Sequence, residues 1–91
     1  LINTARGPIV DEQAVITALN NGQLAGAGLD VLQQEPPKAC APVMQALNHP
    51  KLIITPHVAW ASQSAIQTLA DQLMQKIEDY VAGKPIVNLA Q

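Results

Sequence analysis

Short apolar runs of the kind that form strands occur three times along the chain. Residues 1–3 and 52–55 are brief runs, and residues 24–32 form a longer one with a single charge. Uninterrupted apolar runs are typical of strands buried on both faces of a parallel sheet. In the longest run, Gly26 and Gly28 are expected where a helix or a ligand approaches the strand closely.

Apolar residues at steps of three and four predict two helices. The first begins after Asp11 as its N-cap, has Glu12 in its first turn where the helix dipole favours an acid, and stops near residue 21. The second is the longest, and either Ser62 or Ser64 caps it. Its apolar face, expected to point inward, contains Ile66, Leu69, Ala70, Leu73, Ile77, Tyr80 and Val81.

The order of these elements predicts an α/β protein. Prolines make residues 33–42 a loop, residues 43–47 form a short helix, and residues 86–89 a final short strand or extended tail. Strands separated by helices pair in parallel through right-handed crossovers. The three main strands are therefore predicted to be one edge of a doubly wound, Rossmann-like sheet, followed by a long C-terminal helix. Such sheets bind ligands at the carboxyl ends of their strands.

Composition suggests a piece of a larger cytoplasmic protein. Only 13% of the residues are charged, about half of the usual share, which indicates faces normally covered by something else. The chain also opens inside an apparent strand, without Met. A net charge of −2 favours neither nucleic acid nor anionic lipid, and no apolar run is long enough for a membrane span. A single cysteine, Cys40, suits a reducing compartment and receives no role.

Four polar side chains follow the predicted strands. Arg6, the only arginine, comes just after the first strand, Asp30 ends the second, Glu35 lies in the next loop, and His57 closes the third. A guanidinium can grip a carboxylate with two hydrogen bonds, and an imidazole exchanges protons near neutrality. Taken singly, Arg6 and Glu35 are more often solvated loop residues and His57 a structural histidine, and Asp30 is as readily a turn cap as a ligand.

Their combination points to chemistry on a 2-oxo acid. Arg6 would hold the substrate carboxylate, His57 would exchange a proton with the neighbouring oxygen, and Glu35 would stabilise the protonated imidazole. No zinc-ligand spacing, no G-x-S-x-G elbow and no G-x-G-x-x-G fingerprint occurs in the chain. Hydride transfer is thus favoured over metal-dependent or serine-based hydrolysis.

The motifs resemble those of the NAD-dependent D-2-hydroxyacid dehydrogenase family. The resemblance covers essentially the whole chain, and Trp60-Ala61-Ser62 is most similar to the glycerate dehydrogenase (hydroxypyruvate reductase) branch. The motifs that carry it are Asn3-Thr4-Ala5-Arg6-Gly7, Gly26-Ala27-Gly28-Leu29-Asp30-Val31, Glu35-Pro36 and Thr55-Pro56-His57.

The resemblance implies a role for each matched residue. Arg6 would bind and polarise the substrate, His57 would be the acid/base and Glu35 its partner. The nicotinamide of NAD, or of NADP as the alternative cofactor, would lie against Asp30, His57, Arg6 and the backbone of two residues. Those two are Thr4 and Ala5. Formate-oxidising members have Gln at the position of the glutamate, so Glu35 argues against that activity. No metal site is implied.

The resemblance also implies a domain division. Residues 1–60 would complete the NAD-binding domain, and residues 61–91 would cross back to a substrate domain. The phosphate loop and most of the substrate domain would lie upstream, so the isolated chain is expected to be inactive, and the whole enzyme is expected to be a homodimer acting on a small 2-oxo or 2-hydroxy acid. Two alternatives are a non-catalytic, corepressor-like module of the same fold and a lone structural domain.

Overall fold

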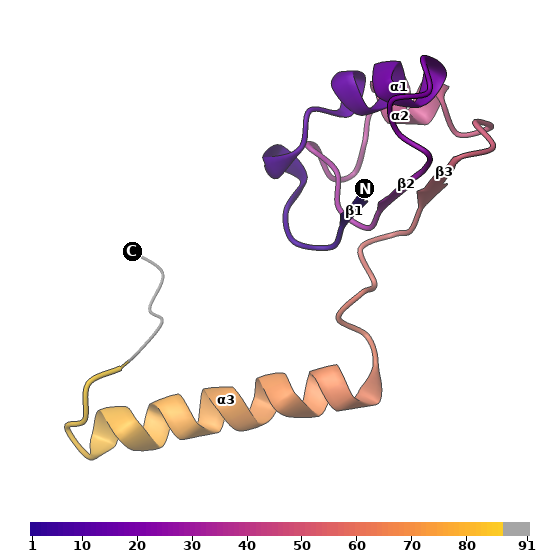
Figure 1. The fold of residues 1–91 in the computed structure, drawn as a ribbon. Helices are drawn as coiled ribbons and strands as arrows, with labels where there is room; N and C mark the ends of the chain where they lie inside the picture. The colour runs from indigo at the N-terminus through magenta and orange to yellow at the C-terminus, as the bar shows by residue number, and fades with distance from the viewer. Residues whose placement is uncertain (87–91) are drawn as a thin grey trace. The chain divides into compact units, whose positions relative to one another are not determined.

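The computed structural model describes residues 1–86 and divides the chain into two compact units, Leu1–Ala59 and Trp60–Gln91. Within residues 1–86, the first unit contains the strands and the shorter helices, and the second contains the long helix (Figure 1). The elements in order are β1 (Ile2–Asn3), the 3-10 turn η1 (Gly7–Ile9), α1 (Glu12–Asn20), β2 (Ala27–Leu29), α2 (Pro42–Gln45), β3 (Leu52–Ile54) and α3 (Gln63–Val81).

The sheet has three parallel strands in the order β1-β2-β3, which confirms the predicted fold class. In register, Gly28 lies between Ile2 of β1 and Ile53 of β3. The middle strand is shorter than the predicted span of 24–32, because its ladder extends only as far as its short neighbours. Leu24 instead bonds to the end of α1, where its N–H meets the Ala18 carbonyl at 3.0 Å.

The core lies on one face of this sheet, under α1 and α2. It combines apolar residues of the sheet, α1 and α2, and Val43 of α2 is completely buried. On the other face Ile2 is 80% and Ile53 69% exposed. The prediction that the middle strand is buried on both faces is therefore wrong for residues 1–86, which supply only one helical layer. The buried core residues are Val15, Ile16, Leu19, Ala27, Leu29, Leu32, Val43 and Leu52.

Both predicted helix N-caps are confirmed. The Asp11 carboxylate accepts a hydrogen bond from the Ala14 N–H at 3.0 Å, and the Ser62 hydroxyl accepts one from the Ala65 N–H at 3.2 Å. These bonds satisfy backbone donors that a helix leaves without partners in its first turn. Ser62, rather than Ser64, is thus the cap of α3. The short helix α2 begins one residue before the predicted 43–47, with Pro42 in the first turn, a position that suits proline.

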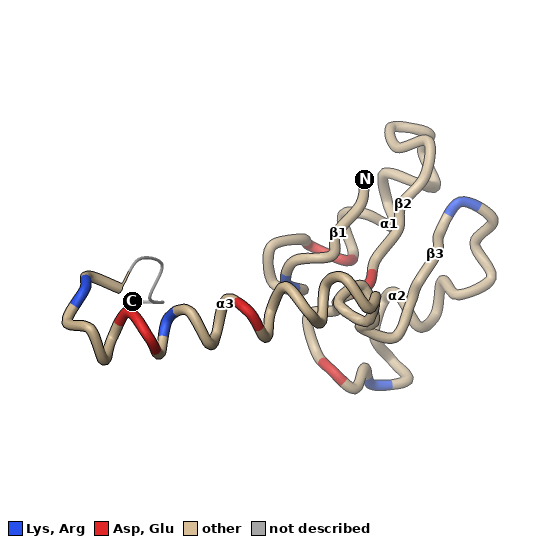
Figure 2. Tube along the Cα trace, turned by 90° about the horizontal axis from the view of Figure 1, so that it is seen from below, with Lys and Arg blue, Asp and Glu red and all other residues tan. Residues whose placement is uncertain are grey.

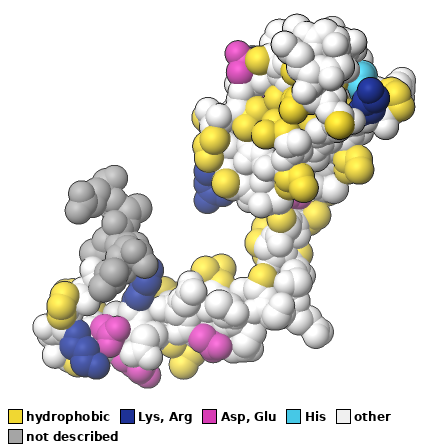
Figure 3. Space-filling model, in the orientation of Figure 1, with side chains coloured by type: hydrophobic (Ala, Val, Ile, Leu, Met, Phe, Trp, Pro, Cys, Tyr) yellow, Lys and Arg dark blue, Asp and Glu magenta, His cyan; other side chains and the backbone are white. Residues whose placement is uncertain are grey.

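Helix α3 carries the predicted apolar stripe, but no described residue buries it. Ile66, Leu69, Leu73 and Ile77 are each about half exposed or more, and apolar side chains are visible along the helix surface in Figure 3. The same helix holds three acidic residues and one basic residue, Asp71, Lys76, Glu78 and Asp79 (Figure 2). None of the helices within residues 1–86 has the length and hydropathy that a bilayer crossing needs. The predicted return to a substrate domain stays a prediction, and most of the predicted segment 86–89 lies outside the described residues.

Among the glycines of residues 1–86, the approach of another backbone segment is tightest at Gly7. A Cβ on Gly7 would overlap the carbonyl group of Leu32. By contrast, a Cβ on Gly26 would lie 3.5 Å from the Lys51 carbonyl oxygen, and one on Gly28 4.0 Å from an Ile2 side-chain carbon, both ordinary contacts. At Gly7, the segment after β1 therefore packs directly against the segment after β2.

Candidate functional site

Three segments that follow the strands meet around one surface hollow. Its volume is about 330 Å³, and Arg6, Glu35 and His57 all line it. The remaining lining residues are Gly7, Pro8, Val31, Leu32 and Gln33. Because the strands are parallel, their carboxyl ends share one edge of the sheet, which is why residues far apart in sequence gather here.

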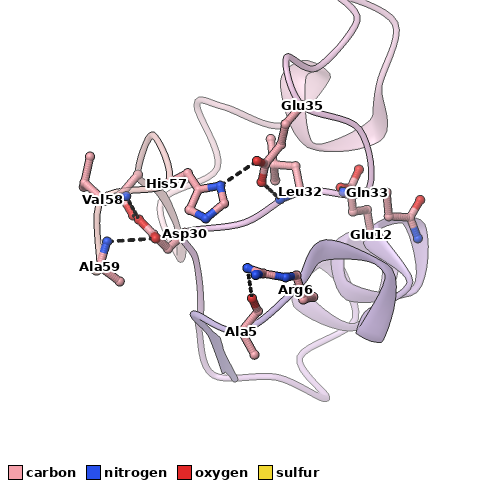
Figure 4. A network of polar contacts seen from close by, with 11 residues as sticks. Ala5, Arg6, Glu12, Asp30, Leu32, Gln33, Glu35, His57, Val58 and Ala59 are labelled. Atoms are coloured by element: carbon pink, nitrogen blue, oxygen red, sulfur yellow. Dashed lines mark hydrogen bonds and ion pairs between the residues drawn. The ribbon is translucent and has the colours of Figure 1, made fainter. Parts of the chain in front are cut away.

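The imidazole of His57 and the carboxylate of Glu35 point toward one another (Figure 4). His57 Nδ1 lies 2.6 Å from Glu35 Oε2, and the Leu32 N–H donates to Glu35 Oε1 at 2.8 Å. The Leu32 N–H, followed by the His57 ring, lowers the pKa of Glu35, so this carboxyl is ionised at neutral pH. An ionised carboxylate only accepts hydrogen bonds. The Nδ1 atom therefore carries the hydrogen, and the proton that the ring can exchange is the one on Nε2.

A left-handed backbone turn presents His57. Its φ angle is +56°, and its N–H donates to the Thr55 carbonyl at 3.0 Å. Non-glycine residues adopt this conformation infrequently, and histidine, asparagine and aspartate do so more readily than most. The sequence pattern predicts His57 at the end of a strand, but it does not indicate this turn.

Asp30 holds the turn together. Its side chain is only 6% exposed, and its Oδ1 accepts hydrogen bonds from the Thr55 hydroxyl at 2.6 Å and the Val58 N–H at 2.9 Å. Its Oδ2 accepts one from the Ala59 N–H at 2.9 Å. The acid that ends β2 thus fixes residues 55–59 and not the turn directly after β2, which was the structural alternative to a ligand role.

Asn3, to which sequence analysis gave no individual role, fixes the loop that presents Arg6. Its buried side chain donates to the Arg6 carbonyl at 2.9 Å and accepts from the Ala5 N–H at 3.1 Å. Arg6 Nη1 in turn donates to the Ala5 carbonyl at 3.0 Å (Figure 4). Thr4 and Ala5 are exposed at this edge of the sheet.

Glu12 is a second residue whose place the sequence did not reveal. It is 5% exposed, and its Oε1 accepts a hydrogen bond from the Gln33 N–H at 2.6 Å. In the sequence, the helix dipole alone accounts for an acid at this position. Its partner is 21 residues away, so no local pattern could have indicated the contact.

A family model decides the identity of the fold. The model described as "D-isomer specific 2-hydroxyacid dehydrogenase, NAD binding domain" matches residues 1–59. The chain belongs to this family. The resemblance seen in the sequence motifs is thereby confirmed, and the match spans the unit that contains the hollow.

Similar proteins include a glycerate dehydrogenase and a hydroxypyruvate reductase. A glycerate dehydrogenase of Methylorubrum extorquens is 56% identical over 85 residues, covering 93% of this chain and 27% of that protein. A hydroxypyruvate reductase of Blautia hydrogenotrophica is 40% identical over 86 residues, covering 94% of this chain and 26% of that protein. The chain therefore spans about a quarter of the length of these relatives.

A solved member of the family shares the fold over nearly the whole chain. It is a D-isomer specific 2-hydroxyacid dehydrogenase from Xanthobacter autotrophicus, determined in complex with NADPH and MES. Its sequence is 38% identical, the TM-score is 0.73, and the match covers 99% of this chain and 35% of that one. Among residues 1–86, no group of three or more His, Cys, Asp or Glu side chains is arranged to hold a metal ion.

The two carboxylates of this dehydrogenase-family site make its stability depend on pH. The Thr55 hydroxyl, then the Ala59 N–H, lowers the pKa of Asp30 from its ordinary value of 3.8. Glu35 is likewise lowered from 4.5. A carboxyl whose pKa is lower in the folded state stabilises the fold above its ordinary value, and this stabilisation is lost as pH falls through the folded value.

We therefore expect the chain to lose stability as pH falls below about 4.5, the ordinary value of Glu35, and Asp30→Asn to flatten that dependence. The measurement is urea unfolding of the 91-residue chain, followed by circular dichroism at a series of pH values. Asp71→Asn, in α3 and outside the first unit, controls for the change of charge. Equal pH profiles for Asp30→Asn and the parent chain would contradict the assignment.

Proposed function

We propose that this chain supplies the catalytic end of an NAD(P)-dependent D-2-hydroxyacid dehydrogenase. The observation that carries the proposal is the hollow shared by Arg6, Glu35 and His57, with Nδ1 of the histidine 2.6 Å from the glutamate. These three side chains provide a carboxylate anchor, an acid/base and a group that orients it. The bound nicotinamide supplies the hydride, which goes to the carbonyl carbon of a 2-oxo acid or returns from the 2-hydroxy acid.

Arg6 and His57 would divide the work of binding and proton transfer. The guanidinium of Arg6 would form two parallel hydrogen bonds to the substrate carboxylate, which sets the adjacent carbonyl in the hollow. During reduction His57 would donate its Nε2 proton to the carbonyl oxygen, which stays on the carbon and becomes the hydroxyl group of the 2-hydroxy acid. The ionised Glu35, held by the Leu32 N–H, would stabilise the positive imidazolium before that transfer and keep the ring in place.

The residues at the sheet edge fit the nicotinamide end of the cofactor. Thr4 and Ala5 are exposed there, where a flat ring could approach their backbone. Among residues 1–86, the Asp30 carboxylate accepts three hydrogen bonds, and a carboxylate has about four acceptor positions. The one that is left, on Oδ2, suits the amide group of the nicotinamide carboxamide. The chain has no G-x-G-x-x-G segment, so other residues must hold the phosphates.

Glycerate and hydroxypyruvate are the substrates that we propose. The support is the similarity to a glycerate dehydrogenase and to a hydroxypyruvate reductase. Both compounds have a carboxylate beside the reacting carbon, which is the arrangement that an arginine next to a histidine can bind. Glu35 supports a reaction that moves a substrate proton, as reduction of a 2-oxo acid requires.

A chimera tests the proposal on this chain's own residues. Residues 1–91 replace the matching segment of the Methylorubrum extorquens glycerate dehydrogenase, which is 56% identical, and NADH oxidation is followed with hydroxypyruvate. We expect turnover by the chimera and none by the 91-residue chain alone, because the chain has no phosphate loop. Intrinsic fluorescence and circular dichroism confirm that each protein is folded. A folded chimera that binds NADH but leaves hydroxypyruvate unreduced would refute the proposed function.

A further inference from the structure

We propose that Glu12 is a positioning residue, which holds the segment 32–35 so that Glu35 meets His57. The inference rests on the proposed function, since it concerns the same acid/base pair. Glu12 lies in the first turn of α1 and does not line the hollow. It therefore acts through the chain that carries Glu35.

The burial of Glu12 is not explained by helix capping. The N-cap of α1 is already Asp11, whose carboxylate accepts from Ala14. An acid that only complements the helix dipole gains nothing from burial, because removing a carboxylate from water is costly. Glu12 is nevertheless 5% exposed, and its short bond to the Gln33 N–H, at 2.6 Å, compensates for the lost water.

Further contacts fasten the same short segment. The Gln33 side chain donates to the Val10 carbonyl at 3.0 Å. The absence of a side chain at Gly7 lets its backbone lie close to the Leu32 carbonyl. One residue before Gln33, the Leu32 N–H holds Oε1 of Glu35. Glu12 thus bonds to Gln33, which lies in the sequence between Glu35 and Leu32, the donor that holds the Glu35 carboxylate (Figure 4).

The geometry leaves little room for this segment to move. The Nδ1–Oε2 distance is 2.6 Å, so a shift of about 1 Å would take the pair beyond hydrogen-bond reach. Loss of the Glu12 acceptor would leave the Gln33 N–H without its partner and release the segment from α1. Glu35 is then expected to point away from His57, which would lose its hydrogen bond. Little change is expected at Thr4 and Ala5, the sheet edge proposed for the nicotinamide.

The test compares two uncharged replacements of Glu12 in the chimera. Glu12→Gln keeps an acceptor oxygen at the same position, whereas Glu12→Met fills a similar volume without one. We expect kcat to fall about tenfold or more in the Met variant and to stay within about twofold in the Gln variant, with KM for NADH unchanged in both. Gln13→Met, at an exposed neighbour on α1, controls for placing Met on this helix.

A double-mutant cycle separates positioning from a general structural effect. In a Glu35→Gln background, Glu12→Met should lower kcat by less than about twofold, because its target is already altered. Equal kcat values for the Met and Gln variants, or a Met effect that is undiminished in the Glu35→Gln background, would overturn the proposal. If the Met variant fails to fold, Glu12→Asp, which draws the carboxylate back by one methylene, is expected to show the same loss of kcat.

A measurement without turnover keeps this inference separate from the proposed function. In the 91-residue chain, ¹H–¹⁵N spectra of the histidine side chains report which ring nitrogen of His57 carries hydrogen. We expect the Nδ1–H form in the parent chain and in Glu12→Gln, and a mixture of tautomers in Glu12→Met. An unchanged Nδ1–H form in the Met variant would overturn the role of Glu12, even if the chimera reduces hydroxypyruvate.

Discussion

Replacing His57 by asparagine in the chimera is expected to lower kcat about 10²- to 10⁴-fold, the range that a general acid/base contributes. Asparagine is the suitable replacement because it accepts the left-handed backbone, φ +56° at this position, better than most residues. It cannot take up or release a proton near neutrality. Loss of turnover therefore reports the missing acid/base and not a distorted turn.

The affinity for NADH should survive this change, since the turn of residues 55–59 keeps its bonds to Asp30. Stopped-flow reduction of hydroxypyruvate measures kcat, and NADH fluorescence measures the dissociation constant. His49→Asn provides the matched control, because His49 bonds to the Lys51 N–H and does not line the hollow. Turnover by the His57→Asn variant within tenfold of the parent chimera would remove His57 from its proposed role.

Replacing Gly7 by alanine is expected to destabilise the chain by about 3 kcal/mol, at the upper end of what overpacking usually costs. The added Cβ would overlap the Leu32 carbonyl, and backbone atoms cannot rotate away as a flexible side chain can. Either the turn after β1 or the segment after β2 must move. Because the first presents Arg6 and the second presents Glu35, the variant chimera should also lose turnover.

Gly26→Ala is the control for this prediction. Its Cβ would lie 3.5 Å from the nearest heavy atom, the Lys51 carbonyl oxygen, so the free energy of unfolding should change by less than about 1 kcal/mol. Urea unfolding of the 91-residue chain, followed by circular dichroism, measures both variants. Equal midpoints for the two would show that the chain relaxes around Gly7 without cost.

Local signals in the sequence predicted the elements and their caps. Asp11 and Ser62 cap the helices as expected, since each needs only the backbone N–H three residues further on. The three strands, their parallel pairing and the gathering of Arg6, Glu35 and His57 followed from the alternation of strands and helices.

The sequence could not reveal contacts whose partners lie far along the chain. Glu12 meets Gln33 across 21 residues, and Asp30 meets Val58 across 28. The length of β2 was overestimated because an apolar run continues past the end of the ladder, and the ladder depends on neighbouring strands. Gly26 and Gly28 stand out in that apolar run. Among the glycines of residues 1–86, however, the one with no room for a Cβ is Gly7, which lies against the Leu32 carbonyl.

The row of Ile2, Gly28 and Ile53 across the uncovered sheet face has a practical consequence for work with the chain alone. Exposed apolar surfaces of strands self-associate as the protein concentration rises. Samples of the 91-residue polypeptide should accordingly be kept dilute, and light scattering should accompany every unfolding experiment. Ile53→Thr, which retains a β-branched side chain, is a reasonable solubilising change for spectroscopy.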